Sequence, residues 1–361
     1  MATLEEIARL AGVSKSTVSR ALADSPLISE RTKRRVKQIA SRANYQPDVR
    51  AKSLRTRISH TITLLIHSDQ PRQPNLTDPF ALKFIGLVGT ELRKRNYDML
   101  IAIADCRDPE TGNNYVRSGK SDGLIVFGRL TDDSALQHIA AGDIPVICWG
   151  IPTSNVRYHS VGIDNVALVR EVVEKLIQAG RRRIGFIGSE QACAEYGLRF
   201  SGYRQAFLEA GLDVKENLVI IQEESPRPGY RAMQKILDSA QPDAIFACSD
   251  VRALEACQAI REAGLNIPRD VAVVGFDNIE LGKCSSPALS TISQGITDGG
   301  AAQLVNTLLK AIQVKSLIAE INNHPSALQQ PLTETAATRT IMLPGQFIVR
   351  ESCGLLPLNK R

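Results

Sequence analysis

From residue 61 onward, short apolar runs alternate with longer segments of helical spacing, and this alternation constrains the fold more than any other feature. The apolar runs are rich in β-branched residues and are too short for helices, which indicates buried parallel strands. They are TITLLI, DMLIAIA, GLIVF, PVICW, RIGFIG, LVII, DAIFAC and DVAVVGF. The segments between them predict crossover helices over residues 80–95, 165–179, 200–210, 230–239 and 251–263. We therefore expect an α/β fold of two doubly wound sheets, with a ligand cleft beyond the carboxyl ends of the strands.

The N-terminal segment 3–22, TLEEIARLAGVSKSTVSRAL, predicts two short amphipathic helices separated at Gly12. Thr3 and Glu6 have the spacing of a capping box, and Ser14 is placed to cap the second helix. Five apolar residues recur at helical spacing: Ile7, Ala8, Ala11, Val18 and Leu22. Short polar and basic side chains on the second helix suit phosphates and base edges in a major groove, namely Lys15, Ser16, Thr17 and Arg20. The pattern is typical of a helix-turn-helix, and a hairpin used only for packing is the alternative.

Positive charge is concentrated at the N-terminus. Residues 1–60 carry 13 Lys and Arg against 5 Asp and Glu, a net charge of +8, whereas the whole chain has +6. A third helix is expected from Ser29 through ERTKRRVKQIASRANY, with a solvated basic face of Arg31, Lys33, Arg34, Arg35 and Lys37. Such a footprint favours binding to a polyanion. Without a lipidation motif, nucleic acid is a better partner than a membrane surface.

The remaining composition excludes several classes of protein. Seven cysteines are scattered without a two-residue spacing, so we expect reduced thiols and neither a zinc nor a redox site. The five histidines show no metal-ligand spacing, and neither a nucleophile elbow nor a P-loop is present; we expect no enzyme, cofactor or metal. The longest apolar runs are too short to span a bilayer and no signal segment is evident, which predicts a cytoplasmic protein, nucleoid-associated when bound to DNA. Residues 313–338 are expected to form a long mobile connection.

Taken together, these segments resemble the lac repressor family of bacterial transcription regulators over nearly the whole chain. The motifs that carry the resemblance are AGVSKSTVSRAL, ERTKRRVKQIASRANYQP, AKSL, DPF (78–80), GIDN (162–165), RRRIGFIG (181–188), LRFSGYRQAF (198–207), CSD (248–250), VVGFDN (273–278), PALSTISQ (287–294) and IVRES (348–352). The resemblance implies an all-α helix-turn-helix headpiece followed by a periplasmic-binding-protein-like effector domain of two doubly wound α/β subdomains.

The resemblance also implies the domain boundaries. The DNA-binding domain spans residues 1–46, the hinge 47–60, and the effector-binding and dimerisation domain 61–361. Within the last, the N-subdomain covers about 61–162 and 294–320, and the C-subdomain about 163–292 and 321–361. Three crossovers between the subdomains are expected near residues 161–164, 291–295 and 319–322. The chain ends after IVRES without leucine heptads, so a homodimer is expected.

The family's pattern implies two sets of site residues. On the DNA side, Lys15, Ser16 and Arg20 match positions that touch base edges, while Ser14, Thr17, Asn44 and Tyr45 match backbone-contacting or supporting positions. In the hinge, Ala51, Leu54 and Arg55 are placed at the DNA, with Leu54 as the wedge in the minor groove. On the effector side, the matching positions are Asp78, Phe80, Trp149, Arg199, Glu224, Asp250 and Asp277.

The effector set suits a sugar, because an arginine, several carboxylates and one indole provide hydrogen bonds and a stacking face. Core packing is the alternative for Phe80 and Trp149, and helix capping for Asp250. Glu224 and Cys193 stand where the purine-binding branch of the family has an aromatic and an arginine, which disfavours a nucleobase. We expect a repressor that binds a palindromic operator as a dimer and is released by a mono- or disaccharide. Nucleosides, other metabolites and a sugar-binding module without a DNA role are the alternatives.

Overall fold

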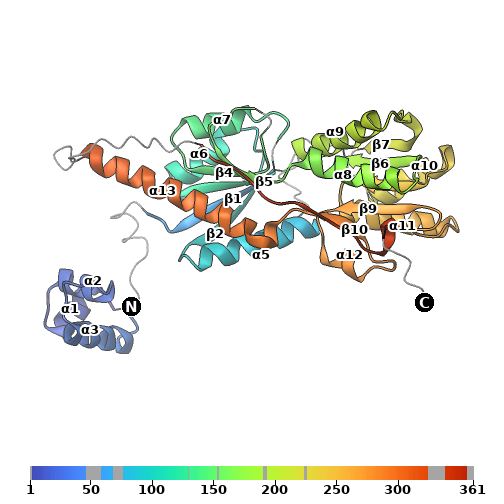
Figure 1. Ribbon diagram of the computed structural model, residues 1–361. Coiled ribbons are helices and arrows are strands. Elements are labelled where there is room, and N and C mark those ends of the chain that lie inside the picture. The colour runs from blue at the N-terminus through green and yellow to red at the C-terminus, as the bar shows by residue number, and fades with distance from the viewer. Residues whose placement is uncertain are drawn as a thin grey trace. The chain divides into compact units, whose positions relative to one another are not determined.

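The structure is a computed structural model of the chain, and it describes residues 2–45, 58–67, 76–128, 130–152, 154–189, 193–222, 226–323 and 338–355. The chain divides into two compact units, Met1–Ser59 and His60–Arg361 (Figure 1). Ala51, Leu54 and Arg55 of the predicted hinge lie outside the described residues, as does Glu224.

The N-terminal unit is a bundle of three helices, α1 (Leu4–Ala11), α2 (Lys15–Leu22) and α3 (Glu30–Arg42). Thr3 and Glu6 form the predicted capping box, and Ser14 and Ser29 cap α2 and α3 through their hydroxyls. Gly12 ends α1 with φ of 64°, a left-handed conformation that glycine adopts without strain. The helices bury a small core of Ile7, Ala8, Ala11, Val18, Ala21, Val36 and Ala40. The three predicted helices are confirmed.

The second unit contains two six-stranded sheets, in the orders β11-β5-β4-β3-β1-β2 and β12-β10-β9-β8-β6-β7. The first comprises β1 (Thr61–His67), β2 (Asp98–Ala104), β3 (Gly123–Phe127), β4 (Val146–Trp149), β5 (His159–Gly162) and β11 (Thr340–Met342). The second comprises β6 (Ile184–Ser189), β7 (Val219–Gln222), β8 (Ala244–Ala247), β9 (Ala272–Phe276), β10 (Ser290–Ser293) and β12 (Gln346–Ile348). All pairs are parallel except that of β10 with β12. The predicted doubly wound α/β fold is confirmed.

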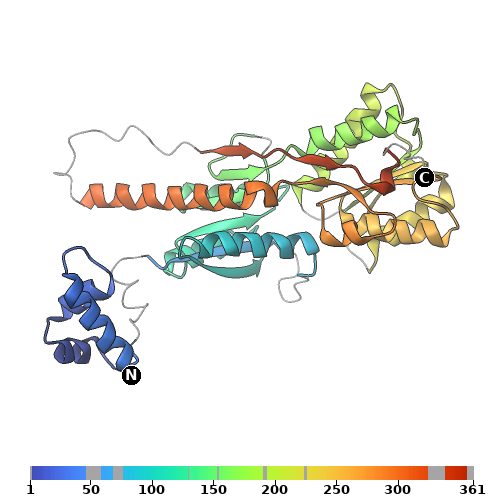
Figure 2. The same ribbon diagram turned by 60° about the horizontal axis from the view of Figure 1, so that its bottom comes forward.

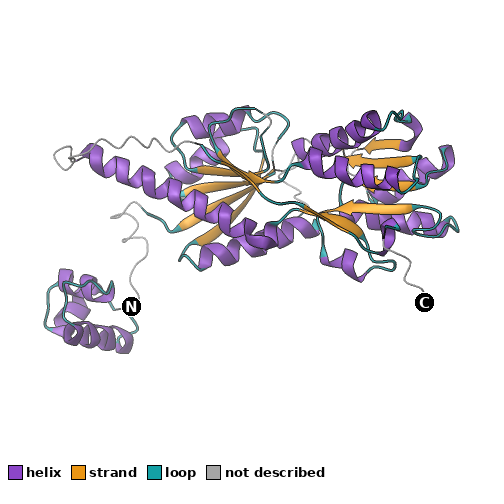
Figure 3. Cartoon of the chain, viewed as in Figure 1, coloured by secondary structure: helices purple, strands orange, loops and turns teal. Residues whose placement is uncertain are grey.

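Helices cover both faces of each sheet (Figure 3). Around the first sheet, which forms the N-subdomain, they are α5 (Pro79–Arg93), α6 (Pro109–Arg117), α7 (Ser134–Ala141) and α13 (Ala301–Asn323). Figures 1 and 2 show α13 beside α5, whereas α6 and α7 lie together on the opposite face. Around the second sheet, which forms the C-subdomain, they are α8 (Asn165–Gln178), α9 (Ala194–Glu209), α10 (Pro228–Ser239), α11 (Asp250–Glu262) and α12 (Glu280–Cys284). Short helical turns are η1 (Glu216–Leu218), η2 (Ile296–Gly300) and η4 (Glu351–Cys353).

The described chain passes between the two sheets three times. The passages follow β5, which ends at Gly162, and β10, which ends at Ser293, and a third joins β11 to β12 through residues 343–345. The prediction of a third crossover near 319–322, with the C-subdomain resuming at 321, was wrong. Those residues continue α13, and β11 still pairs with β5 of the N-subdomain. The expected connection over 313–338 is therefore helical up to Asn323, and residues 324–337 lie outside the described part.

Candidate nucleic-acid interface and effector cleft

Helix α2 carries the predicted base-reading residues, Lys15 and Ser16 in its first turn and Arg20 in its last, and all three are exposed. Lys15 is paired with Glu5 of α1, with 2.5 Å between Nζ and Oε1. The hydroxyl of Ser16 lies 2.8 Å from that of Ser14, which also accepts from the backbone N–H of Thr17. The guanidinium of Arg20, in contrast, has no hydrogen bond or ion pair with another described residue. Arg20 is thus the side chain most available to a guanine edge.

The basic face of α3 differs from the expectation at one position. Lys33 was expected to be solvated, but it is only 8% exposed, and its ammonium donates to Glu30 Oε1 at 2.7 Å. The alkyl stem of lysine packs readily on apolar surface, and one turn of helix brings the carboxylate within reach. At the end of α3, Asn44 is exposed with φ of 48°, and Tyr45 packs against the small core. These two residues mark the end of the described N-terminal unit.

In the C-subdomain, Arg199 of α9 is held on three sides. Its Nε donates to Asn165 Oδ1 at 3.0 Å, and Nη1 donates to the carbonyl oxygen of Cys248 at 2.6 Å. The guanidinium carbon lies 3.6 Å from the centroid of the Phe276 ring, a cation–π contact. The side chain is 5% exposed, and Nη2 has no partner among the described residues. Arg199 therefore presents one rigidly held donor.

Asp277 follows β9 directly and provides an acceptor. Its φ of 109° is strained for a residue other than glycine, and Asn278 next to it also has a positive φ of 52°. Asp277 is 8% exposed; its Oδ1 accepts from Gln294 Nε2 at 2.6 Å, and Oδ2 has no partner among the described residues. Burial raises the pKa of Asp277 well above its ordinary value, although the charge of Arg199 opposes this shift.

Trp149 stands at the end of β4 in the N-subdomain, and its ring is buried. Its indole Nε1 donates to Gln294 Oε1 at 3.3 Å. Since Gln294 also donates to Asp277, one amide connects Trp149 of the N-subdomain with the carboxylate of the C-subdomain. Gln294 lies just beyond β10, on the passage between the two sheets.

Asp78 and Phe80 stand at the start of α5. Asp78 is exposed and caps the helix by accepting from the N–H of Ala81 at 2.7 Å. Its negative charge contributes to the raised pKa of Asp277, so the two carboxylates lie near each other. Phe80 is buried in the main core, and its ring centroid is 6.1 Å from that of Phe127. For Phe80, this geometry fits the core-packing alternative.

Asp250, the first residue of α11, is completely buried. Its Oδ1 accepts from the Thr291 hydroxyl at 2.6 Å and its Oδ2 from the Ile279 N–H at 2.9 Å, while Ser249 caps the helix. Burial raises the pKa of Asp250 to about 7. Oδ2 therefore holds the loop that follows Asp277 directly, and Oδ1 holds it through Thr291, whose hydroxyl also accepts from the N–H of Asn278. Both carboxylate oxygens are thus occupied within the C-subdomain.

Three residues near Arg199 were not predicted from the sequence: its neighbours Glu195 and Tyr196, and the bridging Gln294. The Tyr196 ring centroid lies 5.4 Å from the guanidinium, and burial raises the pKa of its phenol well above the ordinary value. Glu195 is buried beside it and accepts from the thiol of Cys193 at 2.9 Å. Gln294 belongs to the motif PALSTISQ, so its position in that motif was the only signal available for any of the three.

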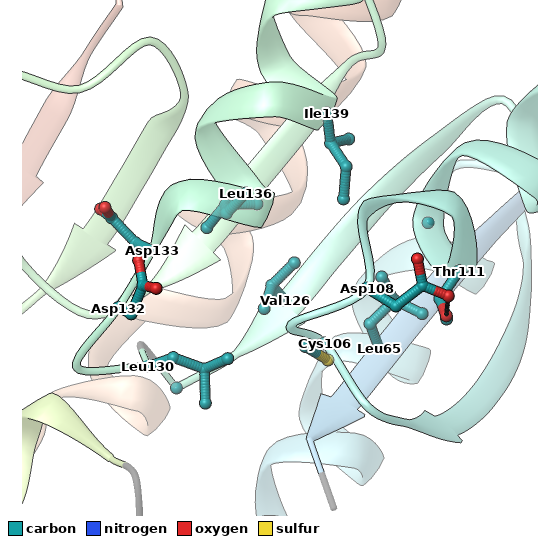
Figure 4. A pocket seen from close by; sticks show the side chains of 12 residues that line it. Leu65, Cys106, Asp108, Thr111, Val126, Leu130, Asp132, Asp133, Leu136 and Ile139 are labelled. Atoms are coloured by element: carbon teal, nitrogen blue, oxygen red, sulfur yellow. Dashed lines mark hydrogen bonds between the residues drawn. The ribbon is translucent and has the colours of Figure 1, made fainter.

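A separate pocket lies in the N-subdomain between α6 and α7 (Figure 4). Leu136 and Ile139 line one side, and Cys106, Asp108 and Thr111 the other. The cavity measures about 20 Å³, which is room for roughly one water molecule. It is therefore too small to hold a sugar.

Comparisons with known proteins agree with this architecture. Residues 3–48 match the family model "Bacterial regulatory proteins, lacI family", and residues 173–353 match "Periplasmic binding protein-like domain". The regulator DegA of Bacillus subtilis is 30% identical over 363 residues, covering 99% of both chains. CelR of Thermobifida fusca is 32% identical over 298 residues, covering 81% of this chain and 86% of its own.

Solved structures give the same result. A complex of the regulator CelR with cellobiose covers 98% of this chain and 100% of its own, with 28% identity and a TM-score of 0.66. The lac repressor dimer bound to operator covers 98% and 99%, with 22% identity and a TM-score of 0.79. The protein class defined by the headpiece and the two-sheet unit is a DNA-binding transcriptional regulator, not an enzyme. The chain belongs to the lacI family. No described helix combines the length and apolar character needed to cross a bilayer.

Proposed function

We propose that this chain is a repressor that binds a palindromic operator as a homodimer and is released from it by a small sugar. The observation that carries the effector half is the pair of open polar atoms in the C-subdomain, Arg199 Nη2 and Asp277 Oδ2. One fixed donor and one fixed acceptor match a hydroxyl group, which both donates and accepts. The half-buried ring of Tyr196 supplies apolar surface for a face of a sugar ring, whereas the buried Trp149 acts on the site through its bond to Gln294.

The complex of CelR with cellobiose supports a disaccharide as one candidate, since that protein is similar to this chain along nearly its whole length. We assign three further residues to the same effector site: Asp78, Tyr196 and Glu224. Asp250 supports it indirectly, because it holds the Asp277 loop in place.

For the DNA half, Lys15, Ser16 and Arg20 contact base edges, and Ser14, Thr17, Asn44 and Tyr45 contact or support the phosphate backbone. The hinge then docks with Leu54 in the minor groove, beside Ala51 and Arg55. Unstacking a base step costs a few kcal/mol, so two hinges must act together. Effector binding needs to change operator affinity by only about 1 to 3 kcal/mol to act as a switch.

The decisive experiment is a gel shift with an operator selected from random DNA, run across a salt series with and without cellobiose, ribose and glucose. Specific binding that weakens steeply with salt and is released by a sugar supports the proposal. Tighter binding with sugar would contradict release. Sugar binding without any sequence-specific DNA binding would favour the binding-module alternative.

Two variants test the DNA-binding residues separately. Leu54→Ala should weaken specific binding more than nonspecific binding. Arg34→Ala should mainly reduce the dependence of DNA affinity on salt concentration.

A further inference from the structure

The ion pair between Glu5 and Lys15 joins the first turns of α1 and α2. Both side chains are exposed, Glu5 by 74% and Lys15 by 56%, and exposed pairs contribute little to stability. Glu5 is not needed to cap α1 either, because Glu6 and Thr3 form the capping box. On a surface that faces a polyanion, an unneeded carboxylate would only weaken binding. A carboxylate in the first turn of α1 also interacts favourably with the helix dipole, but that role does not explain why it lies beside a base-reading lysine.

We propose that Glu5 and Lys15 read one G·C base pair of the operator together. The Lys15 ammonium donates to guanine O6 and N7, while the Glu5 carboxylate accepts from the N4 amino group of the paired cytosine. This inference rests on the proposed function, in which α2 enters the major groove. It makes Glu5 a specificity-determining residue on the helix that precedes the reading helix.

The spacing of the pair fits the base edges. Guanine O6 and cytosine N4 are hydrogen-bonded to each other, so they lie about 2.9 Å apart. Nζ of Lys15 and Oε1 of Glu5 are 2.5 Å apart, so the two groups can face the two base atoms side by side. An inverted C·G pair would place the Lys15 ammonium against the cytosine amino group and the Glu5 carboxylate against guanine O6. We therefore expect this base pair to be rejected most strongly. A T·A pair offers the lysine one acceptor instead of two.

The N-terminal unit contains a matched control. Lys37 and Asp24 form a second exposed pair, also with 2.5 Å between Nζ and Oδ1, and Asp24 is 64% exposed. Asp24→Asn removes the same charge as Glu5→Gln, from a loop outside the first turn of α2. Asparagine also tolerates the positive φ of 53° at this position. Neither substitution touches the buried core, and circular dichroism would verify that both variants fold.

The test is selection of operator sequences from random DNA by the full-length chain, its Glu5→Gln, Lys15→Met and double variants, and the Asp24→Asn control. We expect the unmodified protein to prefer G·C over C·G at one position of each half-site by about tenfold or more. Each Glu5 and Lys15 variant should lower that preference below about threefold without altering other positions, and Asp24→Asn should leave it intact.

Two results would overturn the inference. If Glu5→Gln changes affinity equally for all sequences, as Asp24→Asn does, the carboxylate acts only through its charge. If the selected motif has no position that responds to substitution of Lys15 and Glu5, the pair does not read a base. The proposed function as a DNA-binding regulator would still stand. An unmodified chain that selects no sequence would instead refute the proposed function itself.

Discussion

Lys83 of α5 donates from Nζ to the carbonyl oxygen of Asn278 at 3.1 Å, so the N-subdomain is tied to the residue that directly follows Asp277. The same ammonium lies 3.9 Å from Glu280 Oε1. Asn278 is further held by Arg350, whose Nη2 donates to its side-chain oxygen at 2.6 Å. The loop that carries Asp277, the acceptor that we propose for the effector, is therefore also a point of contact between the two subdomains.

Lys83→Met should shift the equilibrium between different relative positions of the two subdomains. The substitution removes the hydrogen bond to Asn278, which stabilises the relative position seen in this structure. The bond is worth about 1 kcal/mol, so operator and effector affinities should change in opposite directions by roughly fivefold. Gel shifts and isothermal titration would measure the two affinities. Loss of both affinities together, or no change in either, would show that this contact does not participate in coupling.

Arg199→Met should abolish the rise in melting temperature that a bound sugar gives the protein. The variant removes the open donor and leaves Asn165 Oδ1 and the Cys248 carbonyl without their partner. Loss of a buried charged partner costs about 1 to 3 kcal/mol of stability as well. A thermal-shift series with cellobiose, ribose and glucose measures both effects. Unchanged sugar binding in a folded variant would remove Arg199 from the site.

We expect ionisation of Asp250 to lower the free energy of unfolding as the pH rises. Its pKa is raised from 3.8 to about 7 in the folded chain, so folding favours the protonated form. Its contribution is complete below pH 4 and is lost as the pH rises towards 7. Three pKa units correspond to at most about 4 kcal/mol. Urea unfolding of the unmodified protein and of Asp250→Asn at pH 5 and 8 isolates this group. The unmodified chain should lose stability relative to the variant at pH 8, and parallel pH profiles would contradict the assignment.

Gln294→Leu should disturb both subdomains, since it leaves the Trp149 indole and Asp277 Oδ1 without their shared partner. Each unpaired buried group costs about 1 to 3 kcal/mol, and the melting temperature should fall accordingly. Trp149 is the sole tryptophan of the chain, so its emission reports this site alone. An emission spectrum and a melting temperature identical to those of the unmodified protein would mean that the bridge is not maintained in solution.

The sequence predicted β1 to β4 and β6 to β9 correctly because each lies in a continuous apolar run, although β2 and β7 are edge strands and are only partly buried. It missed β5, β10, β11 and β12, which have three or four residues, since HSVG and STIS include polar residues and short strands carry weak periodicity. It also missed α6, α7, α12 and α13. Helix α9 begins at Ala194 instead of near residue 200, because a buried arginine and a buried glutamate obscure its apolar face.

The sequence predicted the charged residues of the candidate site better than its neutral ones, and it could not separate ligand-facing carboxylates from structural ones. Asp277 is conspicuous as a charge at the end of a strand, and Arg199 of α9 indeed lies close enough for the two charges to interact. A carboxylate has the same appearance in sequence whether it faces a ligand or a backbone N–H, so Asp250 could not be distinguished from Asp277. Neutral connectors such as Gln294 carry no charge signal, and only the three-dimensional contact reveals them.

The passage through residues 343–345 has a consequence for biosynthesis. Since β11 completes the edge of one sheet and β12 that of the other, neither sheet is complete until these two late strands have left the ribosome. The three-helix unit precedes both sheets in the chain and contains its own core. The three helices can therefore fold before either sheet is complete, and a ligand site that needs both sheets can form only after them.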